Sequence, residues 1–287
     1  MYNGPIINIH THLRLKDDLP ARVANWRKWN LRKVVCLSVH DRWSVGGYCV
    51  NRDFPAIMQR HPDIIIGFAA VNLVAGQIEK PGAIDRFKEQ SYAGLKFEDN
   101  SYPYNHDIYW PLYERAEKLG MPILFHTGFL APLKADDCNP DGRDGIDSEN
   151  MRPYLLDRVA RTFPKLIIIG SHLGMPHHQE AVCMMKHSNV YFDFSGGGGC
   201  NQFVHAVTAA LSPSLPGANM SDPGENPALE LFEKKLLFAT DNPEPEVWVP
   251  ASERIMDRLQ IPQPIRENFY YKTAASILGI PCEEWKA

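Results

Sequence analysis

The sequence lacks the features that would place the chain in a membrane or on nucleic acid. Its longest apolar runs, such as KLIIIG and KLLFAT, are far shorter than the roughly 20 residues that cross a bilayer. Lysine and arginine number 30 against 34 for aspartate and glutamate, which gives a formal net charge of -4 and no broad basic field. We therefore expect neither a membrane nor a nucleic acid as a partner.

The cysteines show no spacing that is typical of a metal site or of disulfide bonds. The six cysteines show neither a C-x-x-C pair nor a regular spacing, which argues against a zinc ribbon or a disulfide framework and predicts reduced thiols. The few residues before the first apolar run lack the charged and long apolar segments of a secretory signal. We expect a cytoplasmic protein.

Short apolar runs bounded by turn residues recur along the chain and predict eight strands. They cover residues 5–10, 33–39, 64–71, 92–97, 122–127, 165–172, 189–195 and 235–240. Amphipathic stretches between and after them predict helices at 18–29, 51–60, 80–90, 107–119, 150–162, 177–187, 202–211, 226–234, 250–259 and 264–279.

The alternation of strand and helix indicates the fold class. Continuous apolar runs are typical of parallel strands that are buried on both faces. Eight strand-then-helix units in 287 residues favour a closed (β/α)₈ TIM barrel of the α/β class over an open sheet. No linker interrupts the pattern, so we expect one domain over residues 1–287. Residues 128–149 directly follow a strand and are a candidate lid or substrate-selecting loop.

Polar side chains stand at the ends of four predicted strands. His10 and His12 end the first, His126 the fifth and His172 the sixth, and Asp241 follows the eighth. A single histidine after a strand is more often a hydrogen-bonding residue than a metal ligand. Because the carboxyl ends of barrel strands meet at one mouth, the joint occurrence favours a shared site.

The H-x-H pair of the first strand indicates a metal site. Residues i and i+2 of a strand project to one face, so His10 and His12 can present two imidazole nitrogens to one ion at about 2.0–2.1 Å. A third ligand and a carboxylate would complete an open site of nitrogen and oxygen donors. Such a site suits Zn²⁺, with Mn²⁺ or Fe²⁺ as alternatives.

Six segments, in chain order, resemble the amidohydrolase superfamily: INIHTHL, GLKF, PILFHTG, IIGSHLG, NVYFDFSG and LLFATDNP. More narrowly they resemble its amidohydrolase-related (amidohydrolase 2) branch, which includes aminocarboxymuconate semialdehyde decarboxylase, aromatic acid decarboxylases and lactone hydrolases. The resemblance continues into the closing segment RENFYYKTAASILGI and so covers nearly the whole chain. It implies a barrel with His172 as a general acid/base or substrate polariser and one divalent ion held by His10, His12, His126 and Asp241.

Two positions depart from the branch. Lys272 replaces the usual small amide near the closing helix, with no evident consequence. Asn8 stands where an aspartate is frequent, and we expect this to affect strand packing rather than the metal.

Several cations and polar groups near the predicted mouth are candidates for substrate binding. Lys96 ends the fourth strand; in binuclear relatives a lysine there is carboxylated and bridges two metals, but we favour a point charge for an anionic substrate. Arg14 and Arg42 could clamp a carboxylate or simply face water, and His40 is a candidate by position. The glycine run at 194–200 could cradle a phosphate, but it lacks the spacing of a nucleotide fingerprint, and we favour a flexible loop with close backbone approach to the metal.

These observations favour a metal-dependent hydrolase of a small anionic lactone, ester or amide. A bound metal activates water, and Asp241 could take its proton. The alternative is a non-oxidative decarboxylase of an aromatic or muconate-type acid, although many aromatic decarboxylases of the branch carry glutamate in place of the first histidine of the pair. A non-catalytic metal or ligand binder is a third hypothesis. We allow for a homo-oligomer.

Overall fold

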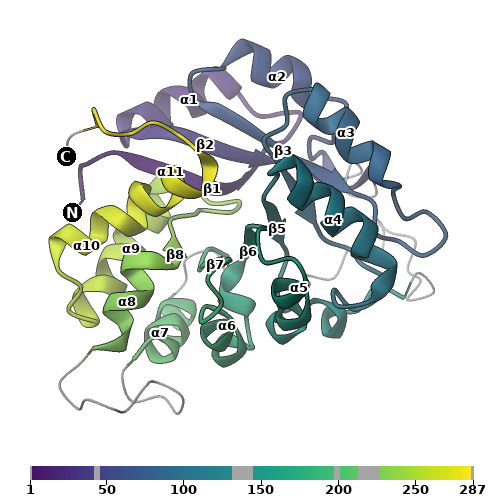
Figure 1. Ribbon diagram of the computed structural model, residues 1–287. Coiled ribbons are helices and arrows are strands. Elements are labelled where there is room, and N and C mark those ends of the chain that lie inside the picture. The colour runs from purple at the N-terminus through teal and green to yellow at the C-terminus, as the bar shows by residue number, and fades with distance from the viewer. Residues whose placement is uncertain (1, 42–45, 131–144, 197–200, 213–225, 286–287) are drawn as a thin grey trace.

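Eight parallel strands form the centre of the computed structural model, which describes residues 2–41, 46–130, 145–196, 201–212 and 226–285 (Figure 1). The strands pair in chain order, from β1 to β8. They are β1 Ile6–His12, β2 Leu31–Leu37, β3 Ile65–Val71, β4 Gly94–Phe97, β5 Ile123–Phe125, β6 Ile168–Gly170, β7 Val190–Asp193 and β8 Leu236–Leu237.

The sheet closes between its first and last strands. The Ile9 amide donates to the Phe238 carbonyl at 3.0 Å, and Thr11 forms a parallel bridge with Asp241. The predicted (β/α)₈ barrel is therefore confirmed. Several strands are shorter than the apolar runs that predicted them, most of all β8.

Helices cover the outside of the barrel (Figure 1). They are α1 Leu19–Lys28, α2 Phe54–Arg60, α3 Pro81–Glu89, α4 Trp110–Leu119, α5 Leu156–Thr162, α6 His178–Met184, α7 Asn201–Ala210, α8 Pro227–Lys234, α9 Pro245–Arg258, α10 Gln263–Glu267 and α11 Thr273–Leu278. Proline stands in the first turn of α1, α2, α3, α4, α8, α9 and α10, where its missing N–H leaves no helical hydrogen bond unmade. Within the described residues, no helix is long and apolar enough to cross a membrane.

Two apolar layers bury the two faces of the sheet. On β2, Val35 and Leu37 belong to a cluster inside the barrel, whereas Val34 and Cys36 belong to the larger cluster between the sheet and the helices. The inner cluster also contains Ala274 and Ala275 of α11 and Tyr271 just before it. Burial on both faces explains why the strands show as continuous apolar runs in the sequence.

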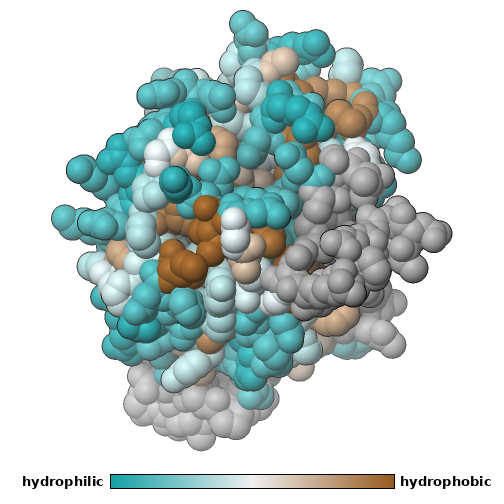
Figure 2. Space-filling model, turned by 90° about the vertical axis from the view of Figure 1, so that its right-hand side faces the viewer, coloured by the Kyte–Doolittle hydropathy of each residue, from teal (hydrophilic) through white to brown (hydrophobic). Residues whose placement is uncertain are grey.

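The surface outside these layers is largely polar. The face drawn in Figure 2 is mainly hydrophilic, with hydrophobic residues gathered near its centre and toward its upper right. Among the described residues, the exposed large hydrophobic side chains are Leu15, Ile108, Phe129, Tyr154 and Val247. Scattered exposure of this kind is ordinary for a folded protein.

A bulge in β1 determines where its histidines point. Asn8 lies opposite Val34 and Thr11 opposite Cys36, so three steps along β1 match two steps along β2. The extra residue lets two successive side chains, Ile9 and His10, turn to the inside of the barrel. Ile9 packs in the inner cluster, and His10 faces the mouth.

Asn8 supports this bulge through its side chain. Its amide nitrogen donates to Thr240 Oγ1 at 2.9 Å, and its oxygen accepts from the backbone amides of Thr240 and His10 at 3.2 Å each. These bonds hold the closing seam between β1 and the segment after β8. They agree with the expectation that this position affects strand packing.

Candidate active site

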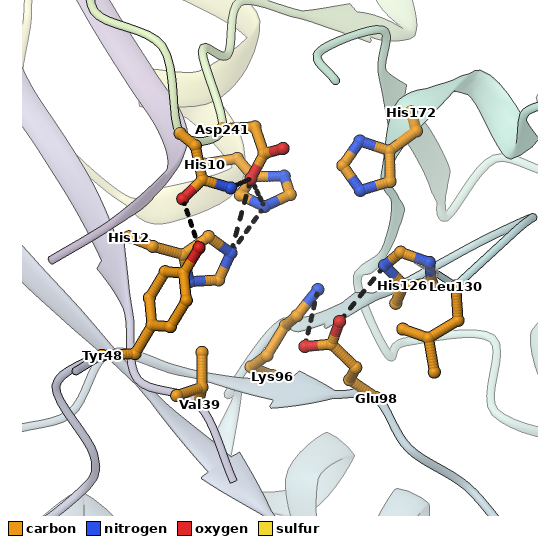
Figure 3. Close-up of a pocket in the computed structure, with 11 residues that line it drawn as sticks. His10, His12, Val39, Tyr48, Lys96, Glu98, His126, Leu130, His172 and Asp241 are labelled. Atoms are coloured by element: carbon orange, nitrogen blue, oxygen red, sulfur yellow. Dashed lines mark hydrogen bonds and ion pairs between the residues drawn. The ribbon is translucent and has the colours of Figure 1, made fainter. Parts of the chain in front are cut away.

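A cavity of about 150 Å³ lies at the carboxyl ends of the strands (Figure 3). Its lining gathers residues from across the barrel: His10, His12, Val39, Tyr48, Lys96, Glu98, His126, Leu130, His172, Asp241 and Asn242. The structure thus brings six of the nine predicted site residues to one place. Arg14 and His40 are not among the described residues that line it, and Arg42 lies outside the described residues.

Three donor atoms on one side of the cavity converge on a single point. His10 Nε2 lies 3.3 Å from His12 Nε2, and Asp241 Oδ1 lies 3.5 Å from each nitrogen. Ligands at 2.0–2.1 Å from a tetrahedral Zn²⁺ would be separated by about 3.3–3.4 Å. The two imidazoles and the carboxylate therefore fit a divalent ion.

Asp193, at the end of β7, orients the first of these imidazoles. Its Oδ2 lies 3.0 Å from His10 Nδ1, and its Oδ1 accepts from Ser195 Oγ at 2.6 Å and from the amides of Ser195 and His172. Burial alone would raise the pKa of Asp193, but His10, His172 and the Ser195 hydroxyl outweigh it and hold the pKa below the usual range. An ionised Asp193 keeps the His10 proton on Nδ1, which turns the Nε2 lone pair toward the ion site.

His172 follows β6 in a left-handed conformation, with φ of 60°, which few non-glycine residues adopt. Its Nδ1 lies 2.9 Å from the Ser195 carbonyl and must donate to it, so Nε2 of the neutral ring carries no proton. Gly196, which follows Ser195, allows this approach because it has no Cβ. A Cβ at that position would lie 2.7 Å from His172 Nδ1. The approach of the glycine run to the metal stays a prediction; Gly196 lies against the His172 ring, and 197–200 lie outside the described residues.

Burial favours the neutral form of three histidines of the cavity, His12, His126 and His172. It lowers the pKa of His12 to about 3, with a further contribution from His10. Burial also lowers the pKa of His126 and of His172. For Asp241, burial raises the pKa, but the neighbouring histidines outweigh it and lower the pKa overall. Neutral imidazoles beside an ionised carboxylate are the protonation states that bind a metal.

Arg22 of α1 joins the two backbone segments that carry the ion site. Its Nη1 donates to the His12 carbonyl at 3.0 Å and lies 2.6 Å from Asp17 Oδ2, and its Nε lies 2.7 Å from Glu244 Oε1. Thr11 Oγ1 donates to the Asp241 carbonyl at 2.8 Å in the same region. Arg22 was not among the predicted site residues, because nothing in the local sequence distinguishes it from a surface arginine of an amphipathic helix.

The opposite wall holds a different group of side chains. Lys96 Nζ lies 3.9 Å from Glu98 Oε2, and Glu98 Oε1 lies 3.4 Å from His126 Nδ1 (Figure 3). His126 Nε2 lies 3.2 Å from the Phe129 carbonyl, so this imidazole faces Glu98 and stands outside the three-atom group. Ligation by His126 stays a prediction. Glu98 was missed, although its i+2 spacing from Lys96 in LKFE places it on the same face of β4.

Arg14 does not line the cavity itself but contacts Tyr48, which does. Its Nη2 donates to the Tyr48 hydroxyl at 2.9 Å, and its guanidinium lies 4.5 Å from the centre of that ring. The Tyr48 hydroxyl in turn donates to Asn242 Oδ1 at 3.0 Å. Arg14 therefore supports one side of the mouth, and a direct contact between Arg14 and substrate remains a prediction.

Solved structures similar to this one include enzymes that hold metals. The chain is 16% identical to 2,6-dihydroxybenzoate decarboxylase from Rhizobium, covering 98% of this chain and 99% of that one with a TM-score of 0.60. It is also 16% identical to dihydroxybenzoic acid decarboxylase from Polaromonas sp. JS666 with bound manganese and the inhibitor 2-nitroresorcinol (98% of each chain, TM-score 0.61). An amidohydrolase from Burkholderia multivorans with bound zinc is 11% identical (97% and 100%, TM-score 0.60). At such identities the likeness establishes the fold.

Comparison with sequences gives the family. No curated protein sequence matches the chain. The amidohydrolase family model matches residues 33–280, which is most of the chain. The barrel, the histidine and aspartate residues at its mouth and this match lead to one conclusion: the chain belongs to the amidohydrolase family.

Proposed function

We propose that this protein is a metal-dependent hydrolase of a small lactone, ester or amide. The observation that carries the proposal is the convergence of His10 Nε2, His12 Nε2 and Asp241 Oδ1 within 3.5 Å of one another. Donors of this type suit Zn²⁺, and Mn²⁺ or Fe²⁺ are alternatives. The manganese and zinc bound in two similar structures support a divalent ion here.

The chain's own residues divide the chemistry between them. When bound, a divalent ion supplies Lewis acidity, which polarises a carbonyl and lowers the pKa of water toward about 7. His10 and His12 would hold the ion through their Nε2 atoms. Asp241, whose pKa is lowered, is ionised at neutral pH and can accept the proton of the attacking water and pass it to the leaving group.

His172 is placed to act on the same substrate. Its protonated Nδ1 is fixed on the Ser195 carbonyl, which leaves the unprotonated Nε2 for the cavity. It can accept a hydrogen bond or a proton from the substrate there. Its centroid lies 5.2 Å from the His10 ring and 5.0 Å from the His126 ring, so it stands between the two walls.

A non-oxidative decarboxylase is the second candidate. It is favoured by the two decarboxylases described above, each covered over nearly its whole length. Against it, the first residue of the strand-1 pair is His10, whereas the resemblance described above associates many aromatic decarboxylases with glutamate there.

Isotope labelling distinguishes the two reactions. We expect the zinc-loaded protein, screened against lactones, esters, amides and aromatic acids in ¹⁸O water, to place label in its product without releasing CO₂. In the same assay Asp241→Asn should lower kcat by about 10²–10⁴, the range for a general acid/base group. Release of CO₂ without label would replace hydrolysis by decarboxylation, and the metal-free protein serves as the control.

A further inference from the structure

The wall of the cavity that faces the ion site carries one hydrogen-bond donor and one hydrogen-bond acceptor that are not hydrogen-bonded to each other. We propose that Lys96 and Glu98 form a subsite for a substrate hydroxyl close to the reacting carbonyl. The inference rests on the proposed function, since it names the polar group that the hydrolysed substrate carries.

Lys96 is the first half of this subsite. Its side chain is 1% exposed, and its Nζ has no hydrogen-bond partner among the described residues. The amino group points into the cavity rather than toward the barrel core (Figure 3). A buried ammonium without a hydrogen bond is costly. A ligand atom that accepts a hydrogen bond would remove that cost.

Glu98 supplies the second half. Its Oε2 lies 3.9 Å from Lys96 Nζ, which is too long for a hydrogen bond, so the two charges attract each other while the donor and the acceptor stay open. Glu98 is 15% exposed, and its other oxygen lies toward His126. The cavity therefore offers an acceptor beside a donor on one wall.

The chemistry of this pair selects among polar groups. A hydroxyl can accept from Lys96 and donate to Glu98 at the same time. A carboxylate can accept from Lys96 but has no proton to donate, and Glu98 would repel it. An ammonium group can donate to Glu98 but cannot accept from Lys96. A hydroxyl is the group that satisfies both side chains.

The charge balance of the cavity modifies the expectation of an anionic substrate. Of the three cations on which that expectation rested, Lys96 lines the cavity opposite Glu98, Arg14 is engaged by Tyr48, and Arg42 lies outside the described residues. The cavity is small, about 150 Å³, and its other wall holds the ion site. A hydroxyl bound by Lys96 and Glu98 would thus belong to a carbon next to the carbonyl that reacts.

The test uses two lactones that differ by one hydroxyl, γ-butyrolactone and α-hydroxy-γ-butyrolactone. We expect the zinc-loaded wild type to have a kcat/KM about tenfold higher for the hydroxylactone, a typical value for a hydrogen bond to a charged group. Glu98→Gln should reduce this ratio to near unity, and Glu98→Asp should retain part of it. Glu149→Gln, at an exposed residue, is the matched control and should keep the wild-type ratio.

Binding of the same two lactones tests the subsite independently of the proposed hydrolysis. Saturation-transfer NMR measures their binding directly, whether or not either one is hydrolysed. Stronger binding of the hydroxylactone that is lost in Glu98→Gln supports the subsite even if no lactone turns over. Equal binding of both lactones, or no detectable binding, overturns it. A preference for a carboxylated lactone that is lost in Lys96→Met also overturns it, in favour of an anion site.

Discussion

The wall of the cavity that contains β1, β7 and β8 differs from the wall that contains β4 and β5 in how its charged side chains are hydrogen-bonded. On the first wall, His10 is held by Asp193, and Asp193 by Ser195 and the His172 amide. On the second wall, Lys96 has no hydrogen bond from the described residues. The difference indicates that the first wall is arranged in advance for a fixed ion and that the second is left open for a ligand that comes and goes.

Removing a ligand from the first wall should have the largest effect. His12→Ala should lose most of the roughly one divalent ion per chain that we expect in wild type, because an incomplete shell binds poorly. Elemental analysis after dialysis measures this, with Glu98→Gln on the second wall as the control. Equal metal in wild type and a His10/His12 double variant would show that the ion lies elsewhere, and loss of metal from His126→Ala would extend the site to the second wall.

Acid should destabilise the metal-free protein through the neutral histidines. The folded pKa of His12 is about 3, below the value of about 6.5 in an unfolded chain. Between these values the unfolded chain binds a proton that the folded chain does not, so the free energy of unfolding falls as the pH falls. Each histidine with such a lowered pKa changes the free energy of unfolding by about 1.4 kcal/mol per pH unit between its folded and unfolded pKa values. Above the unfolded pKa it contributes no pH dependence.

Urea denaturation between pH 7 and pH 5 measures that slope. His12→Gln should make it shallower by about one proton's contribution, and His126→Gln should do the same on the second wall because burial also lowers the pKa of His126. A slope that neither substitution changes would mean that these histidines are already protonated in the folded protein.

Changing Arg22 should have the smallest effect, because Arg22 acts on the ion site through the backbone. Arg22→Met should weaken metal binding about tenfold, at the low end for residues that orient metal ligands, and Arg22→Lys should weaken it less. Competition with a chromogenic chelator gives the affinity. Arg27→Met is the matched control, because Arg27 lies on the same helix but is 58% exposed. If both substitutions left the affinity unchanged, the bond from Arg22 to the His12 carbonyl would have no part in positioning the site.

The strand ends and the H-x-H pair were predictable from sequence because burial on both faces marks each strand and places its end at the mouth. The backbone bulge that turns the His10 side chain toward the mouth was not predictable. Strict alternation would put Ile9 and His10 on opposite faces, but the bulge turns both inward. A bulge depends on the register with β2 and on Asn8 bonding to Thr240, which are contacts between distant parts of the chain.

Side-chain orientation was the other part that sequence could not supply. The strand-end pattern placed His126 at the cavity, yet its ring faces Glu98, which follows β4, a different strand. Arg14 likewise turns toward Tyr48. Asp193 lies within the strand predicted at 189–195, but its importance shows only when the barrel brings it beside His10.

The closing seam between β1 and the segment after β8 also has a consequence for how the protein is made. Thr11 and Asp241, which the seam joins, are 230 residues apart in the sequence. At about 5–20 residues per second, the ribosome completes that interval in roughly 10–50 seconds. Throughout this time the nascent chain carries the two histidines of β1 without their carboxylate partner. The proposed ion site would therefore be complete only at the end of synthesis, once the barrel has closed.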